Sequence, residues 1–206
     1  LDDRGRASYT LVTPAGAAPV RLRVVGAHQV GNTLAAAAIG LAAGLPLAEL
    51  ADALSGLAAV SGRRMDVFDR ADGSTFIDDS YNANPASTAA ALRALAALGA
   101  GRRTVAVLGY MAELGDHERD GHAEVGALAA RLGVDRLLAV GEPAAPILDG
   151  ARAQTTWKGE AVLASDQAAA VRDLERSLRP GDVVLVKGSR YRTWDVADFL
   201  RTGVGA

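Results

Sequence analysis

The chain has 206 residues and a formal net charge of −2, so its composition excludes a strongly basic surface for nucleic acid. It contains no cysteine, which excludes disulfides, thiolate metal sites and cysteine nucleophiles. Half of its residues are hydrophobic, which is enough for a sizeable core, and no apolar run is long enough to cross a membrane. We expect a cytoplasmic globular protein that is a monomer and has no nucleic-acid or membrane partner.

The N-terminal part of the chain is predicted to form two strands followed by two helices. The strands are expected at residues 9–13 and 20–25, joined by a turn at Pro14 to Gly16, and the helices at residues 32–43 and 46–59. So few elements cannot easily close a core. We therefore interpret residues 1–61 as the end of a larger α/β domain, and place the boundary at the polar break before residue 62.

From residue 62 to residue 206, strand-like and helix-like segments alternate. Strands are expected at residues 65–70, 74–78, 104–108, 136–140 and 183–186, and helices at 85–98, 117–132, 165–178 and about 193–201. Alternation of this kind predicts a Rossmann-like, doubly wound and mostly parallel sheet. The strands at 105–108 and 183–186 are apolar on both faces, as buried parallel strands are.

The segment DDSYNANP, residues 78–85, places polar groups where a strand ends and a helix begins. Asn84 can cap that helix and Pro85 suits its first turn. Open α/β sheets bind ligands at the carboxyl ends of their strands, and carboxylates there suit a ribose hydroxyl, an ammonium group or a metal ion. The alternative is a polar loop with a good helix cap.

One motif lies at a helix start in the N-terminal part of the chain, and another lies at the domain boundary. Asn32 follows HQVG at an expected helix start, where it is either an N-cap or an amide that pairs with an adenine edge. Arg63 and Arg64 are either solvated or able to reach a phosphate, because a guanidinium matches phosphate oxygens and keeps its charge.

Two further motifs follow buried strands. VKGSR, residues 186–190, suits an anion through Lys187 and Arg190, or is a surface turn. LGYMAELGDH, residues 108–117, places Glu113 in a loop. His117 and His122 are five residues apart, so they do not share a helix face and predict no metal site.

The order of these motifs, HxxxN, GR, DDSYNANP, LGxMxELG and VLVKGSR, resembles the Mur ligase family. Within it, the motifs resemble most closely the member that adds D-alanyl-D-alanine to UDP-N-acetylmuramoyl-tripeptide. The resemblance implies ATP- and Mg²⁺-dependent amide formation through an acyl phosphate in peptidoglycan precursor synthesis. It also implies that residues 1–61 end a central ATP-binding domain and that residues 62–206 form the C-terminal Rossmann-like domain.

The resemblance implies a role for each matching residue. Asn32 would read adenine, Arg64 would contact the ATP phosphates and serve catalysis, and Asp79 would bind the ribose hydroxyls. The incoming dipeptide would be bound by Asn82, Asn84, Lys187, Gly188, Ser189 and Arg190.

The chain departs from the family pattern in three respects. Tyr110 stands where the family usually has Asp, Gln29 stands where Asn is common, and no phosphate-binding GxxxxGK[ST] loop occurs. We therefore expect the chain alone to be inactive and the magnesium ligands to lie upstream. The alternatives are a stand-alone Rossmann-like module that binds a nucleotide or dipeptide without catalysis, and a related amide ligase of the folylpolyglutamate or cyanophycin synthetase type.

Overall fold

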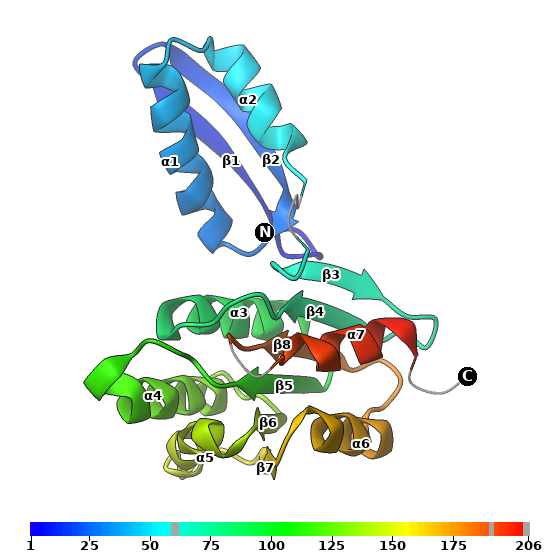
Figure 1. Ribbon diagram of the computed structural model, residues 1–206. Helices are drawn as coiled ribbons and strands as arrows, with labels where there is room; N and C mark the ends of the chain where they lie inside the picture. Colours follow the sequence, from blue (N-terminus) through cyan, green and yellow to red (C-terminus); the bar gives the residue numbers. More distant parts are fainter. Residues whose placement is uncertain (59–61, 190–191, 204–206) are drawn as a thin grey trace. The chain divides into compact units, whose positions relative to one another are not determined.

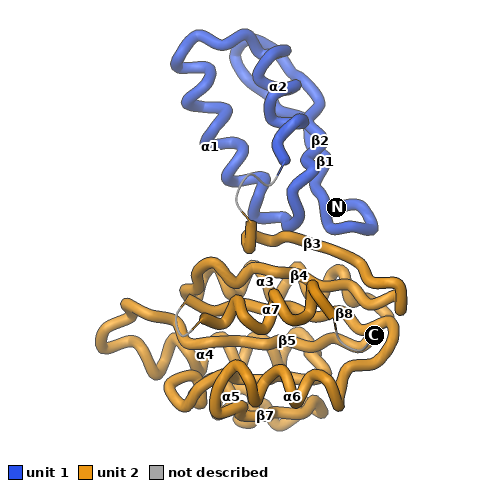
Figure 2. The backbone as a smooth tube through the Cα atoms, turned by 45° about the vertical axis from the view of Figure 1, so that its right-hand side comes forward, with its two compact units in different colours: residues 1–61 blue, residues 62–206 orange. Residues whose placement is uncertain are grey.

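The computed structural model describes residues 1–58, 62–189 and 192–203. The chain divides into two compact units, Leu1–Ser61 and Gly62–Ala206 (Figure 2). We describe each unit by itself.

The first unit is a β-hairpin covered on one face by two helices (Figure 1). Strands β1 (Arg6–Thr13) and β2 (Gly16–Val25) pair antiparallel, and helices α1 (His28–Ala42) and α2 (Leu47–Gly56) follow. Burial alternates along both strands, so every second side chain faces the helices. The buried cluster contains Ala7, Leu11, Val20, Leu22, Ala37, Leu50, Ala51 and Leu54.

Both helices of this unit differ from their expected bounds. Helix α1 begins at His28, so Asn32 lies beyond its first turn and is not an N-cap. Its side-chain nitrogen instead donates to Gln29 Oε1 at 3.0 Å within the same helix. Helix α2 starts after Pro46 and ends at Gly56, earlier than residue 59, which lies outside the described residues.

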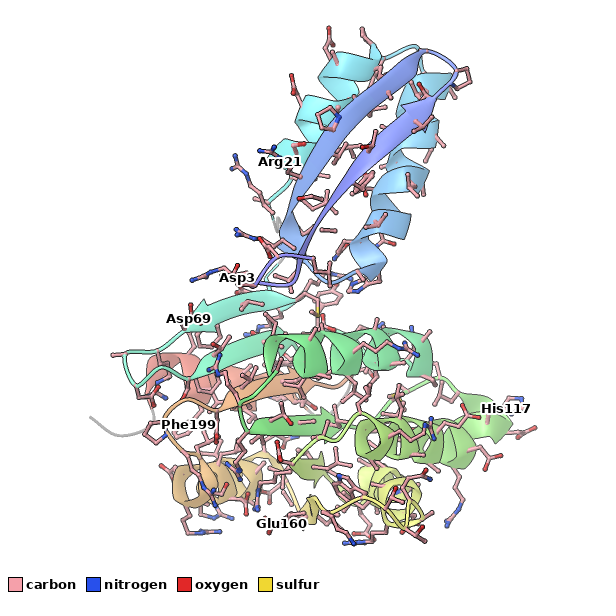
Figure 3. The ribbon with its side chains drawn as sticks, turned by 180° about the vertical axis from the view of Figure 1, so that it is seen from behind. Asp3, Arg21, Asp69, His117, Glu160 and Phe199 are labelled. Carbon is pink, nitrogen blue, oxygen red and sulfur yellow. The ribbon has the colours of Figure 1, made fainter. Side chains whose placement is uncertain are left out.

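The second unit is built on a six-stranded sheet with the order β3-β4-β8-β5-β6-β7. Its strands are β3 (Asp66–Asp69), β4 (Thr75–Asp79), β5 (Thr104–Gly109), β6 (Arg136–Val140), β7 (Glu160–Ala164) and β8 (Val183–Lys187). Only the edge strand β3 runs antiparallel to its neighbour. Figure 3 labels Asp69 and Glu160, which lie on the two edge strands.

Helices cover both faces of this sheet (Figures 1 and 2). One face carries α3 (Pro85–Leu98), α4 (Glu118–Arg131) and α5 (Ala145–Arg152), and the other carries α6 (Gln167–Ser177) and α7 (Trp194–Thr202). Single 3-10 turns occur at Gly115–His117 and Glu142–Ala144. The expected doubly wound, mostly parallel sheet is therefore confirmed.

Two elements of this unit have weak sequence signals and were not expected. Helix α5 is short and carries Pro146 in its first turn, so its pattern resembles a loop. Strand β7 lies at the sheet edge and is only partly buried, so it lacks the continuous apolar run of the central strands. The helix before them, α4, starts and ends within one residue of its expected bounds.

Helices α4 and α5 cross with almost no space between their backbones. A Cβ added to Gly126 would lie 1.7 Å from the Ile147 carbonyl oxygen, and one added to Gly150 would lie 1.9 Å from the Ala123 carbonyl oxygen. A glycine on each helix therefore permits this contact, and any side chain would force the helices apart.

We expect Gly126→Ala to destabilise the second unit by about 3 kcal/mol or more, because backbone atoms cannot move aside as a flexible side chain can. Chemical denaturation of the chain measures this change. Gly62→Ala is the matched control, since a Cβ there meets nothing within 4 Å. Equal stability of the two variants would contradict the close crossing.

Candidate functional site

The carboxyl ends of β4, β8 and β5 bring three sequence-distant motifs to one edge of the sheet. In the parallel register, Asp79 of β4 lies opposite Lys187 of β8, and Lys187 also lies opposite Leu108 of β5. The motif DDSYNANP lies at the end of β4, KGSR at the end of β8 and GYMAELG at the end of β5. This edge is therefore the candidate site.

Lys187 and Asp79 form a buried ion pair at this edge. Lys187 Nζ donates to Asp79 Oδ2 at 2.5 Å and to the Asn82 carbonyl oxygen at 2.9 Å. The Lys187 side chain is 2% exposed and that of Asp79 is 14% exposed. The lysine thus fixes both the end of β4 and the turn after it, and its charge is not presented to solvent.

The segment entering β3 is tied to the same carboxylate. Met65 N donates to Asp79 Oδ1 at 3.0 Å, and Tyr81 N donates to the Arg63 carbonyl oxygen at 3.1 Å. Arg63 and Met65 have φ angles of 62° and 50°, an unusual conformation for residues other than glycine. Hydrogen bonds on both sides of Arg64 therefore hold this strained segment on the second unit.

The two arginines of this segment have different environments. Arg63 Nη2 donates to both carboxylate oxygens of Asp198 on α7, at 2.9 and 3.1 Å. Arg64 is exposed, and its guanidinium carbon lies 4.1 Å from the centroid of the Tyr81 ring. This cation–π contact orients Arg64 along the loop that begins with Asp79.

The neighbouring carboxylate, Asp78, points to the other side of β4 and is 2% exposed. Its Oδ1 accepts hydrogen bonds from Ser80 N at 3.1 Å and Ser80 Oγ at 2.6 Å. Burial raises the pKa of Asp78 above its ordinary value of 3.8, although these hydrogen bonds and the charges of Arg201 and Arg63 oppose the shift. The alternation along the strand thus gives Asp78 and Asp79 separate environments.

Ser189 connects the loop after β8 to the loop after β5. Its Oγ accepts from Ala112 N at 3.0 Å and donates to the Tyr110 carbonyl oxygen at 3.1 Å. Gly188 lies so close to Thr193 that a Cβ there would be 2.4 Å from Thr193 Oγ1. Ser189 and Gly188 therefore determine how the two loops pack, and Arg190 lies outside the described residues.

These loops surround a pocket of about 590 Å³. Its wall is formed by Tyr81, Asn82, Ala83, Asn84, Ala112, Glu113, Leu114, Ser189, Arg192 and Trp194. The volume suits a small polar ligand. Among these residues, the sequence predicted Asn82, Asn84 and Ser189 as binding residues. It assigned no role to Tyr81, although Tyr81 belongs to the DDSYNANP motif, and no motif included Arg192 or Trp194.

The remaining predicted residues lie in other settings. Asn84 is the N-cap of α3, as expected, because its Oδ1 accepts from Ser87 N at 2.8 Å. Asn32 belongs to the first unit, so its relation to this pocket stays a prediction. Within the described residues, no cluster of three or more His, Asp or Glu side chains is arranged to hold a metal ion. In the same residues, no helix is both long and apolar enough to span a membrane.

The doubly wound sheet and its polar carboxyl edge place this unit in the class of open α/β domains, which bind ligands beside the carboxyl ends of their strands. The family described as Mur ligase, glutamate ligase domain, matches residues 63–190. The chain belongs to the Mur ligase family, which confirms the resemblance seen in the order of its motifs.

Individual relatives extend this finding. The chain is 45% identical over 206 residues to UDP-N-acetylmuramoyl-tripeptide–D-alanyl-D-alanine ligase of Mycobacterium leprae (strain TN), an alignment covering 92% of this chain and 40% of that protein. A crystal structure of MurF from Acinetobacter baumannii gives a TM-score of 0.80 at 32% identity, covering 97% of this chain and 43% of that one. MurF from Thermotoga maritima in complex with ADP shares the fold, with a TM-score of 0.76 at 24% identity, covering 97% of this chain and 44% of that one.

We expect Asp79→Asn to destabilise the second unit by about 3–5 kcal/mol, because it leaves the buried ammonium of Lys187 without its counter-charge. The double variant Asp79→Asn with Lys187→Met should be more stable than Asp79→Asn alone. Denaturation of both single variants and the double variant measures the coupling. Strictly additive effects would contradict a buried pair.

Asp78 predicts a pH dependence of stability. Between its ordinary pKa of 3.8 and its raised folded pKa, the folded chain holds a proton that the unfolded chain has lost, so this group's contribution to stability falls as pH rises through that window. Asp78→Asn keeps an acceptor for Ser80 but cannot ionise. We expect its stability relative to the unmodified chain to increase from below pH 3.8 to neutral pH, measured by thermal unfolding over a pH series. A pH-independent difference would contradict the burial effect.

Proposed function

We propose that this chain is the C-terminal part of an ATP-dependent ligase that adds D-alanyl-D-alanine to UDP-N-acetylmuramoyl-tripeptide in peptidoglycan precursor synthesis. Its membership of the Mur ligase family and its 45% identity to the Mycobacterium leprae ligase of that name support the proposal. The observation that carries it is the pocket into which the DDSYNANP, MAELG and KGSR motifs converge.

The chain spans about 40% of the length of that relative, so the complete activity requires further parts. We assign residues 1–61 to the end of a central ATP-binding domain and residues 62–206 to the C-terminal ligase domain. A phosphate-binding loop is absent from this sequence and would lie upstream. The described residues offer no cluster for Mg²⁺, so we assign none of them to that ion.

The reaction in this proposal has two steps. Transfer of the γ-phosphoryl group of ATP to the terminal carboxylate of the tripeptide releases ADP and leaves an acyl phosphate. The amine of D-alanyl-D-alanine attacks the acyl carbon, and phosphate leaves as the amine loses a proton. This chain's contribution is to orient the dipeptide amine against that carbon and to exclude competing water.

The residues that fit the nucleotide side are Asn32, Arg64 and Asp79. Arg64 is exposed and oriented by Tyr81, which suits a cation that meets phosphate oxygens and stabilises their charge. The Asp79 carboxylate accepts one bond at each oxygen, and a carboxylate oxygen can accept a second, so ribose hydroxyls remain possible donors to it. Asn32 is exposed on α1, as a group that reads adenine must be.

The dipeptide side corresponds to the pocket. D-Alanyl-D-alanine carries an ammonium and a carboxylate, so its site needs amides and at least one cation. Asn82, Asn84 and Arg192 line the pocket and can supply amide and guanidinium groups to the dipeptide. Because the Asn84 Oδ1 atom already accepts from Ser87 N, we assign its amide nitrogen to the substrate. We assign Lys187 and Ser189 to holding these loops, and Gly188 to their close packing, while Arg190 stays a sequence-based proposal.

A phosphate-release assay tests this function. The full-length protein should release phosphate from ATP only when UDP-N-acetylmuramoyl-tripeptide and D-alanyl-D-alanine are both present, and D-glutamate should not replace the dipeptide. The 206-residue chain alone should release none, because the sequence contains no phosphate-binding loop.

Calorimetry distinguishes the alternative function. The isolated chain should bind D-alanyl-D-alanine weakly or not at all, because the acyl phosphate and partner domain are absent. Tight binding by the isolated chain, combined with no dipeptide-dependent turnover by the full-length protein, would favour a non-catalytic binding module.

A further inference from the structure

His122 is a fully buried histidine that the proposed reaction does not use. It lies in the first turns of α4 and is 0% exposed. Its Nε2 accepts from Met111 N at 2.9 Å, and its Nδ1 lies 2.7 Å from the Glu118 carbonyl oxygen. A backbone N–H can only donate and a carbonyl can only accept, so the proton is on Nδ1 and the ring is neutral.

The surroundings of the imidazole fix its orientation. The Tyr110 ring stacks on it with centroids 5.2 Å apart and an interplanar angle of 21°. The Tyr110 hydroxyl donates to the Glu118 carboxylate, which keeps that ring in place. On the α3 side, Thr88 Oγ1 donates to Met111 Sδ at 3.6 Å. The His122 ring therefore has little freedom to rotate, and its Nε2 holds the Met111 N–H.

Ser189, from the loop after β8, holds the next residue of the same loop. Its Oγ accepts from Ala112 N, and both its N and its Oγ donate to the Tyr110 carbonyl oxygen. Two consecutive backbone N–H groups, those of Met111 and Ala112, are thus each bound by a buried side chain. Because these hydrogen bonds are buried, they restrict the motion of this loop more than hydrogen bonds in a solvent-exposed turn do.

The residues that follow form a wall of the pocket. Ala112, Glu113 and Leu114 all line it. Glu113 has a φ angle of 67°, a conformation that a residue with a side chain keeps only when its neighbours fix it. Because the loop passes directly from its attachment at Met111 into this wall, the position of the wall depends on the His122 acceptor.

We propose that His122 is a positioning residue: its Nε2 holds the Met111 amide and thereby fixes the wall formed by Ala112, Glu113 and Leu114. The wall in turn limits where a bound amine component can lie. This last step rests on the function proposed above, whereas the attachment of the loop does not.

Two substitutions separate this role from simple packing. In His122→Gln, the side-chain oxygen can occupy the place of Nε2 and accept from Met111 N. In His122→Asn, the shorter amide can occupy the place of Nδ1 and keep the bond to the Glu118 carbonyl, but it cannot reach Met111 N. Ala129→Gly, at a fully buried position later in α4, is the control for loss of helix stability without loss of that acceptor.

Hydrogen exchange in the 206-residue chain gives the first readout. The Met111 and Ala112 amides should exchange at least about tenfold faster in His122→Asn than in the unmodified chain, relative to the α4 amides. His122→Gln should restore most of the protection, and Ala129→Gly should leave it unchanged at these two positions. Equal protection in all variants would overturn the proposal.

A measurement on the unmodified chain is decisive if His122→Asn does not fold. Nitrogen chemical shifts of the His122 ring should show the Nδ1–H tautomer, with a coupling across the bond from Met111 N–H to Nε2. The Nε2–H tautomer would overturn the proposal.

Kinetics of the full-length protein test the effect on the amine component. His122→Asn should raise KM for D-alanyl-D-alanine by about tenfold with a smaller change in KM for ATP, and His122→Gln should recover most of it. Faster amide exchange with no change in KM for the dipeptide would leave the loop attachment established and remove its role in dipeptide binding. Absence of any dipeptide-dependent turnover by the unmodified protein would instead count against the proposed function.

Discussion

The geometry of the candidate site depends on the buried ion pair between Lys187 and Asp79. These residues are distant in sequence but lie opposite each other in the register of β8 and β4. Met65 N also donates to Asp79, and Lys187 also donates to the Asn82 carbonyl oxygen. This one pair of charges therefore connects the segment entering β3, the end of β4 and the first turn of a pocket loop. A buried pair offsets its desolvation only when such further hydrogen bonds are present.

The wall of the pocket formed by the loop after β5 is held by neutral groups. His122 and Ser189 each accept a backbone N–H from the loop after β5, and the glycines at the ends of β5 and β8 allow Thr193 to pack closely between them. The site thus combines a charged attachment on one side with neutral attachments on the other. Rigid support of this kind is what orientation of a reacting amine requires, because small displacements cost large factors in rate.

The sequence predicted the fold class and most elements of the second unit. Buried strands with apolar residues on both faces, and helices with good caps such as the Asn84–Pro85 start of α3, carry strong local signals. Signals were weaker at α5 and β7, where packing against neighbours overrides local propensity. The prediction that Asn32 lies at a helix start was wrong. The residues from His28 onward are also compatible with a helix, and no local signal keeps the helix from starting at His28.

The motifs by themselves determined which chemistry could gather at this edge: carboxylates, amides, a lysine and arginines after parallel strands. Only the tertiary structure decided which of these groups engage each other. The sequence suggested separate ligands for Asp79 and Lys187, yet strand register joins them, and it marked no role for His122, Tyr81 or Trp194. The physical reason is that local composition fixes propensity and chemical type, whereas burial and hydrogen-bond partners depend on residues brought together from distant parts of the chain.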